Sequence, residues 1–234
     1  INKFGEEYLK LKNSLEEDGQ MNFKLLYNSR NIRRKSIPDT ILAWKYFLDT
    51  LSKEKRDKCQ LILHTTPVDE HGTDLPEVIR FLFPEEDHNI VISPNKFSTE
   101  QMSYLYNYVD GTILLSSAEG WGLALTESLL TGTPIIANVT GGMQDQMRFE
   151  DGNGDWVEFN SDFPSNHRGT YKTHGEWALP VYPTNLSLVG SPKTPYIWDD
   201  RCDAEDAAKQ IKALYEMGDI ERKRIGKVGR KWVL

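Results

Sequence analysis

Two glutamates, Glu119 and Glu127, stand at the two ends of a segment that contains two glycines. Glycine lets the backbone come close to a ligand, and the free N–H groups at a helix start suit an anion such as a phosphate. If most of this span is helical, the two carboxylates lie about 12 Å apart along the axis. Carboxylates accept hydrogen bonds from sugar hydroxyls. The spacing therefore predicts a diphosphate between two sugars, with one carboxylate on each sugar.

A second chemistry-bearing segment is the basic run Arg30-Asn31-Ile32-Arg33-Arg34-Lys35, which has four cations in six residues. Arginine binds phosphate oxygens through a bidentate fork, and lysine supplies a point charge. Taken alone, the run is more typical of a solvated loop, and an isolated EGxG is more typical of a plain turn. Both segments follow expected strands, however, and this shared position favours an anion site at one edge of a sheet.

The elements that would position these segments follow from the apolar pattern. Strands are expected at 23–27, 59–64, 89–93, 111–115 and 134–138, and helices at 4–17, 38–51, 75–82, 99–108, 123–131, 204–217 and 221–232. Ser98 with Gln101 predicts a capped helix start, and Gly19 and Gly132 are expected near helix ends. Strands that alternate with helices predict a parallel sheet covered on both faces. We therefore expect a Rossmann-like, doubly wound α/β domain.

The same pattern predicts how the chain is divided. We expect a lead-in helix and linker over 1–22 and one domain over 23–234, with an irregular insertion at about 150–198 that has at most one hairpin. Within it, the run Asp151 to Asp155 is similar to the start of a calcium loop, but Trp156 replaces the required glycine, which favours a polar turn. The chain lacks an initiator Met, so we expect a piece of a longer protein.

Composition excludes several classes of function. The chain has 234 residues, of which 38% are hydrophobic and 27% charged, as in soluble globular proteins. The net charge of -7 argues against a general nucleic-acid binder. Cys59 and Cys202 are far apart, and residues 1–20 lack a signal core, so a reduced, cytoplasmic protein is expected. The five histidines are scattered, so no metal site is expected.

The segment SSAEGWGLALTESLLTGTPIIAN, with Glu119-x7-Glu127 inside it, resembles the signature of the family-4 glycosyltransferases, which have the two-domain GT-B fold. Arg30-x4-Lys35 is similar to that family's Arg and Lys pair after the first strand of the donor domain, and Thr140-Gly141-Gly142 to its glycine pair. The resemblance spans about 23–145, and more loosely the helix from Ala204. It implies the C-terminal, nucleotide-sugar-binding half of a GT-B fold.

The chain departs from that family at three positions. Asp145 stands where the family often has a glutamate, Trp121 where it usually has Phe or Tyr, and His64 where it often has Gly. Carried over by position, the catalytic residues are Glu119, Arg30 and Lys35, and the substrate-binding residues are Gly120, Trp121, Gly122, Leu123, Glu127, Gly141 and Gly142. The resemblance further implies retention of the anomeric configuration without a bound metal or cofactor, because cationic side chains stabilise the leaving diphosphate.

We therefore expect a retaining glycosyltransferase of the hexosyltransferase type that uses a UDP- or GDP-sugar and a glycan, lipid or protein acceptor. The family's N-terminal acceptor-binding domain is missing from these residues, so the alternative is a nucleotide-sugar-binding module without turnover of its own. A doubly wound domain for another phosphorylated ligand is the third interpretation, favoured if neither UDP nor GDP binds. The missing domain is also the part that could hold the protein peripherally on a membrane.

Overall fold

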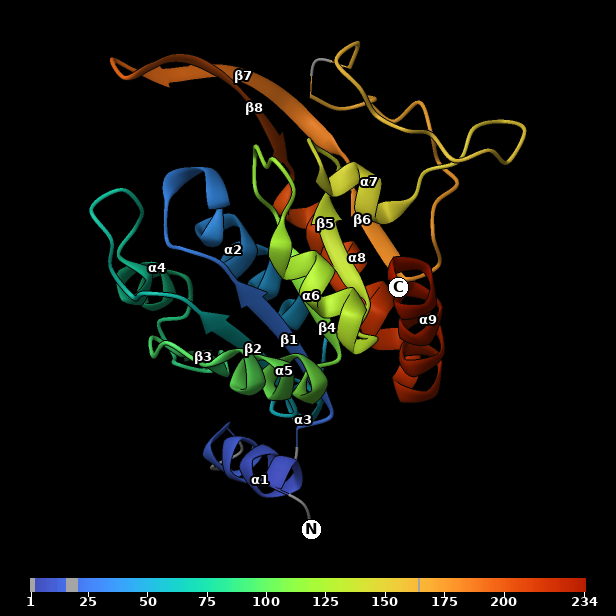
Figure 1. The fold of residues 1–234 in the computed structure, drawn as a ribbon. Helices are drawn as coiled ribbons and strands as arrows, with labels where there is room; N and C mark the ends of the chain where they lie inside the picture. The colour runs from blue at the N-terminus through green and yellow to red at the C-terminus, as the bar shows by residue number, and fades with distance from the viewer. Residues whose placement is uncertain (1–2, 16–20, 164) are drawn as a thin grey trace.

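The computed structural model describes residues 3–15, 21–163 and 165–234, and a six-stranded sheet forms its centre (Figure 1). All neighbouring strands are parallel, in the order β3-β2-β1-β4-β5-β6. The strands are β1 Phe23–Asn28, β2 Cys59–His64, β3 Ile90–Ile92, β4 Gly111–Leu114, β5 Ile135–Asn138 and β6 Ala178–Val181. The strand order reverses between β1 and β4, which is where ligands bind in folds of this kind. The Rossmann-like prediction is confirmed.

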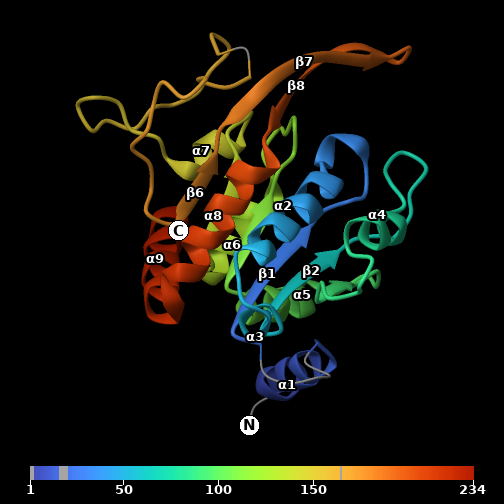
Figure 2. The same ribbon diagram turned by 180° about the vertical axis from the view of Figure 1, so that it is seen from behind.

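Helices cover both faces of the sheet. The view in Figure 1 has α5 and α6 in front, and the view from behind in Figure 2 has α2 and α8 in front. The helices are α1 Lys3–Leu15, the 3-10 turn η1 Arg33–Lys35, α2 Ile37–Asp49, α3 Lys53–Arg56, α4 Leu75–Leu82, α5 Thr99–Tyr108, α6 Leu123–Thr131, α7 Met143–Met147, α8 Ala204–Glu216 and α9 Gly218–Val233. Among the described residues, no helix is both long and apolar enough to cross a membrane.

Local signals explain where several helices begin and end. The Ser98 side chain accepts from the Gln101 N–H and the Gln101 side chain accepts in return, so the predicted capping box starts α5. Gly132 has φ 80°, a conformation that glycine adopts without strain, and it ends α6 as expected. The end expected near Gly19 for the first helix lies outside the described residues.

The buried apolar side chains form two clusters. Under α2 and α8, Phe23 stacks on Trp44 and meets Tyr215 edge-on. Under α5, a second cluster holds Leu26, and Leu15 of α1 packs into it. The lead-in helix α1 therefore packs against the main domain in this structure.

The insertion at 150–198 is more regular than predicted. Residues Ala178–Val181 form β6, paired in register with β5, and a hairpin of β7 (Pro183–Ser191) and β8 (Thr194–Cys202) follows. The four-residue strand was missed because it is short and contains Pro180, which is tolerated at the edge of a sheet. Asp151 accepts backbone N–H groups of Asn153 and Asp155, so the run is a polar turn.

Candidate functional site

The basic run and the Glu119 segment meet at the carboxyl edge of the sheet. The run leaves β1 and the segment leaves β4, and these two strands are neighbours. The backbone N–H of Ser117 donates to the carbonyl of Arg34 at 2.8 Å, which fixes the two loops side by side. The sheet topology thus brings together two segments that are 84 residues apart, measured from Lys35 to Glu119.

The central contact is an ion pair. The Lys35 Nζ and Arg34 Nη1 atoms each lie 2.6 Å from Glu119 Oε2, and the Lys35 and Glu119 side chains are only 9% and 11% exposed. Burial lowers the pKa of Lys35, opposed by its bond to Glu119. Burial also raises the pKa of Glu119, but Lys35 and Arg34 outweigh this and hold it below its ordinary value. Lys35, Arg34 and Glu119 thus form a preformed, partly buried group of charges, which we call the charge centre.

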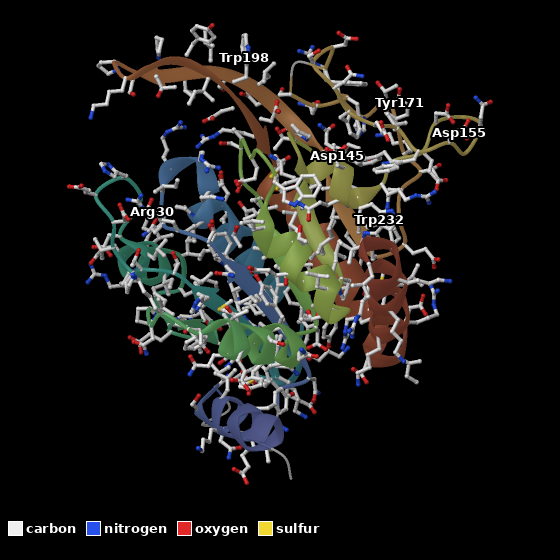
Figure 3. All side chains as sticks on the ribbon, viewed as in Figure 1. Arg30, Asp145, Asp155, Tyr171, Trp198 and Trp232 are labelled. Carbon is white, nitrogen blue, oxygen red and sulfur yellow. The ribbon has the colours of Figure 1, made fainter. Side chains whose placement is uncertain are left out.

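The cations of the run separate in space. Arg34 is at Glu119, although it was not among the predicted site residues, whereas Arg30 pairs with Asp69 at 3.3 Å and is 62% exposed. Figure 3 shows Arg30 on the side of the sheet where α4 lies. Arg33 pairs with Asp199 of β8. Arg33, Arg34 and Lys35 lie in η1, which ends at Ser36 with a φ of 49°, and the sequence carries no signal for this turn.

A cavity of about 470 Å³ lies beside the charge centre, and we call it the Glu119–Glu127 cavity. Its lining residues are Asn28, Ser29, Lys35, Leu114, Glu119, Gly120, Trp121, Gly122, Leu123, Ala124 and Glu127. Seven predicted site residues are therefore brought together around one space. The start of α6 at Leu123 has no side-chain cap, so its first N–H groups are available to an anion.

Glu127 accepts a hydrogen bond from a tyrosine that the sequence analysis did not assign to the site. The Tyr106 hydroxyl donates to Glu127 Oε2 at 2.8 Å and accepts from Asn28 Nδ2 at 2.8 Å. Burial raises the pKa of Tyr106, so the hydroxyl keeps its proton and donates. The sequence pattern predicts only that Tyr106 packs in the core, and its ring is indeed buried. The contacts of its hydroxyl are visible only in the folded structure.

We predict that Tyr106→Phe weakens nucleotide binding by about threefold to tenfold, because Glu127 loses the hydrogen bond that orients it. Calorimetric titration with UDP measures this affinity. Tyr104→Phe is the matched control on the same helix, because the Tyr104 hydroxyl donates to Glu100 at 2.7 Å and does not reach Glu127. Equal UDP affinities for the two variants would show that Tyr106 does not position Glu127.

Gly141 and Gly142 do not line this cavity, although both were predicted to bind substrate. A Cβ atom on Gly141 would lie 2.0 Å from the carbonyl oxygen of Glu119, and one on Gly142 would lie 2.1 Å from that of Gly120. The Gly142 N–H also donates to the Glu119 carbonyl at 3.1 Å. The glycine pair therefore lets the loop after β5 support the Glu119 loop, and direct contact with substrate stays a prediction.

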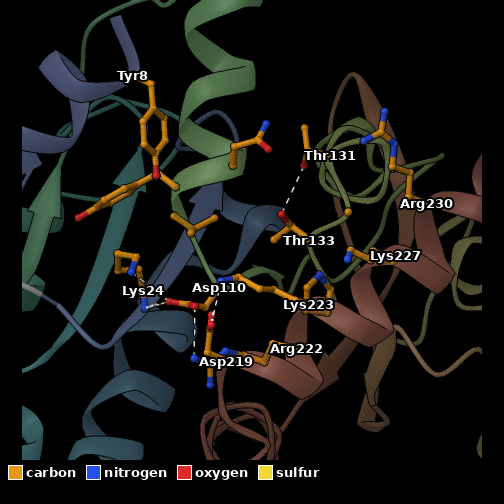
Figure 4. Close-up of a pocket in the computed structure, with 15 residues that line it drawn as sticks. Tyr8, Lys24, Asp110, Thr131, Thr133, Asp219, Arg222, Lys223, Lys227 and Arg230 are labelled. Carbon is orange, nitrogen blue, oxygen red and sulfur yellow. Dashed lines mark hydrogen bonds and ion pairs between the residues drawn. The ribbon is translucent and has the colours of Figure 1, made fainter. Parts of the chain in front are cut away.

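A separate cavity of about 370 Å³ lies at the amino ends of β1 and β4 (Figure 4). Its centre is Asp110, which accepts from the Lys24 backbone N–H at 2.8 Å and pairs with Arg222 at 3.3 Å. Arg222 is 5% exposed, so this network joins α9 to the sheet. The cavity is at the opposite edge from Glu119 and forms no part of the charge centre.

In the described part of the chain, no group of three or more metal-ligating side chains is placed to hold an ion.

Part of the chain matches a known protein family. Residues 85–163 match the family model described as Glycosyl transferases group 1. No curated protein sequence matches the chain significantly. The matched residues include β4, the Glu119 segment and α6, so the match falls on the central part of the site.

Solved structures share the fold. The C-terminal domain of a glycosyl transferase group 1 family protein (LpcC) from Francisella tularensis has a TM-score of 0.61 and 14% identity, with 100% of this chain and 92% of that chain covered. Anabaena HepE in complex with UDP-glucose scores 0.63 at 17% identity, with 97% and 48% covered. Sucrose-phosphate synthase from Thermosynechococcus elongatus scores 0.60 at 21%, with 98% and 43% covered. The fold is that of GT-B C-terminal domains, and this chain spans less than half of the two longer proteins.

Proposed function

We propose that this chain binds a nucleoside-diphosphate sugar and forms the donor half of a retaining glycosyltransferase of the family-4 type. The observation that carries the proposal is the Glu119–Glu127 cavity, which is lined by both carboxylates, by Lys35 and by the residues at the uncapped start of α6. The cations suit a diphosphate, and each carboxylate suits sugar hydroxyls. HepE, which shares the fold, has a structure in complex with UDP-glucose, so UDP-sugars are the first donors to test.

In the proposed reaction, the bond between the anomeric carbon of a hexose and the β-phosphate oxygen breaks. Its electron pair stays on that oxygen, which leaves as part of the nucleoside diphosphate. The acceptor hydroxyl oxygen forms the new bond to the anomeric carbon, and its proton passes to the β-phosphate oxygen that leaves. Lys35 and the α6 start lie where they would stabilise the charge that develops on the leaving oxygen. Retention is proposed from the family resemblance of the motifs.

We predict that Glu127→Ala weakens UDP binding by about tenfold to a hundredfold, because a hydrogen bond from a ribose hydroxyl to a carboxylate is lost. Arg30→Ala is expected to weaken it as well, because the family resemblance assigns Arg30 to the diphosphate; its ion pair with Asp69 would open when the donor binds. Calorimetry with UDP and UDP-glucose measures both affinities. Arg80→Ala is the control, because Arg80 is also exposed and paired, with Glu77. Unchanged affinity in both Glu127→Ala and Arg30→Ala would place the donor elsewhere.

The small share of the longer proteins that this chain matches favours a second candidate function. This chain matches only 48% of HepE and 43% of the sucrose-phosphate synthase, and we propose that an acceptor-binding domain belongs to the complete protein. On its own, the chain would then bind a nucleotide sugar without transferring it. Release of glucose from UDP-glucose by these 234 residues alone, or transfer to an added glycoside, would contradict this second candidate.

A further inference from the structure

The β7–β8 hairpin forms a long arm that leaves the carboxyl edge of the sheet (Figure 1). Its base is firmly attached there. The Asp200 N–H donates to the Ser117 carbonyl at 2.7 Å, the Thr140 hydroxyl donates to Asp200 Oδ2 at 2.6 Å, and Asn138 Nδ2 donates to the Asp200 carbonyl at 2.7 Å. Because Asp200 is fully buried, the inner end of the arm has a fixed position on the ends of β4 and β5.

The arm is also tied to the basic run. Asp199 is 1% exposed and pairs with Arg33, next to the arginine that contacts Glu119. The residues that follow outward along the arm are apolar and lie in register with the other strand, where Trp198 stands opposite Leu188. Trp198, which is labelled in Figure 3, is 44% exposed, so about half of this large apolar side chain is open to a ligand.

A second space of about 460 Å³ lies between the arm and the Glu119 loop, and we call it the hairpin cavity. Its lining residues are Arg34, Ala118, Glu119, Gly120, Thr140, Gly141, Ser165, Ile197 and Trp198. Glu119 and Gly120 also line the Glu119–Glu127 cavity, so the two spaces share one wall. A ligand in the hairpin cavity would therefore sit next to the sugar end of a donor bound on the other side.

The chemistry of the hairpin cavity differs from that of its neighbour. Its one lining cation is Arg34, and none of its lining residues begins an α-helix, so it lacks the uncapped helix start that offers N–H groups to a phosphate in the Glu119–Glu127 cavity. The lining instead combines the apolar side chains of Ile197 and Trp198 with the Arg34 guanidinium and the Glu119 carboxylate. Sugar rings match this arrangement, because one face of the ring is lined by C–H groups and its edge by hydroxyls. Aromatic side chains bind such partly apolar, partly polar groups well.

We propose that the hairpin cavity binds a neutral sugar ring of the acceptor, with Trp198 as the platform against which the ring packs. The proposal rests on the proposed function, because the acceptor is defined by the donor next to it. The sequence analysis assigned acceptor binding to an N-terminal domain that is missing from these residues. Part of the acceptor site is then supplied by the arm of the donor domain.

Saturation-transfer NMR on the chain, with methyl α-glucoside, methyl α-mannoside and methyl α-galactoside as separate probes and UDP present, tests the proposal. At least one glycoside is expected to bind the unaltered chain, and Trp198→Ala is expected to weaken that binding by about tenfold. Tyr196→Ala is the matched control, since Tyr196 is 69% exposed on the same strand but does not line the cavity. Thermal melting of both variants verifies that they fold.

The outcomes separate this proposal from the function on which it rests. UDP affinity is measured in the same samples and is expected to be the same in Trp198→Ala and the unaltered chain. If UDP binds but no glycoside does, or if Trp198→Ala binds the glycoside as well as Tyr196→Ala does, the acceptor subsite is overturned and the donor site stands. If UDP fails to bind while a glycoside binds through Trp198, the donor assignment fails and the cavity is a sugar site of another kind.

Discussion

Lys35→Met is expected to reduce the affinity of the chain for UDP-glucose by about tenfold to a hundredfold, because one charged hydrogen bond to a phosphate is lost. Methionine keeps the length and apolar stem of the side chain but removes the ammonium that lies 2.6 Å from Glu119 Oε2. In a complete enzyme, the rate of transfer is expected to fall by about 10²- to 10³-fold, because charge on the leaving diphosphate loses a preformed partner. Calorimetry and steady-state kinetics measure the two effects.

Two further variants make the Lys35 result specific. Lys35→Arg keeps a positive charge and is expected to retain more of the affinity than Lys35→Met. Lys45→Met removes a lysine of another ion pair, with Asp49 on α2, and is expected to leave the affinity unchanged. A folded Lys35→Met chain that binds UDP-glucose as tightly as the Lys45→Met chain would exclude Lys35 from the donor site.

The same pair predicts a dependence of stability on pH. Lys35 and Arg34 hold the pKa of Glu119 below its ordinary value in the folded chain, so their attraction stabilises the fold above the unfolded-state pKa of Glu119. This stabilisation is lost as pH falls through the folded-state pKa. The free-energy difference of unfolding between the unaltered chain and Lys35→Met should therefore be largest near neutral pH and shrink in acid. Urea unfolding at a series of pH values measures it, and a difference that grows in acid would contradict the assignment.

Much of the fold could be predicted because its signals are local. The five predicted strands agree with β1 to β5 within one residue at each end, since each is a short apolar run between polar or glycine-containing turns. The start of α5 follows from the Ser98 cap and the end of α6 from Gly132. The strand β6 was missed because its four residues, with Pro180 among them, carry too weak a pattern.

The positions of site residues were predictable where the order of the parallel strands alone determines them. Parallel strands bring their carboxyl ends to one edge, so Lys35 and Glu119 were expected to be near each other, and their side chains do pair. Which arginine joins them was not predictable: Arg34 lies in the turn η1 and pairs with Glu119, whereas Arg30 precedes that turn and pairs with Asp69. The Tyr106 contact with Glu127 depends on how α5 packs beside α6, which no local pattern encodes.

The second large expected effect is on stability, and it follows from the tight packing of Gly141 and Gly142. Gly142→Ala is expected to lower the free energy of unfolding by about 1–3 kcal/mol, the usual range for forcing an atom into a filled space. The φ of Gly142 is -68°, which alanine adopts freely, so the cost arises from contact alone. The new Cβ would stand 2.1 Å from the Gly120 carbonyl oxygen and 3.0 Å from the Trp121 Cα, and both are backbone atoms that cannot rotate away. Urea unfolding measures the loss.

Relief of that clash requires the Glu119–Gly120 loop to shift, so UDP affinity should fall together with stability in Gly142→Ala. Gly120→Ala separates the two effects, because a Cβ there meets no atom within 4 Å and Gly120 lines the Glu119–Glu127 cavity. It should keep the stability of the unaltered chain and lose affinity, whereas Gly152→Ala, also in open space and outside the cavity, should change neither. If Gly142→Ala were as stable as Gly152→Ala and lost only affinity, the glycine pair would contact substrate directly, as the family resemblance implies, and would not act by supporting the loop.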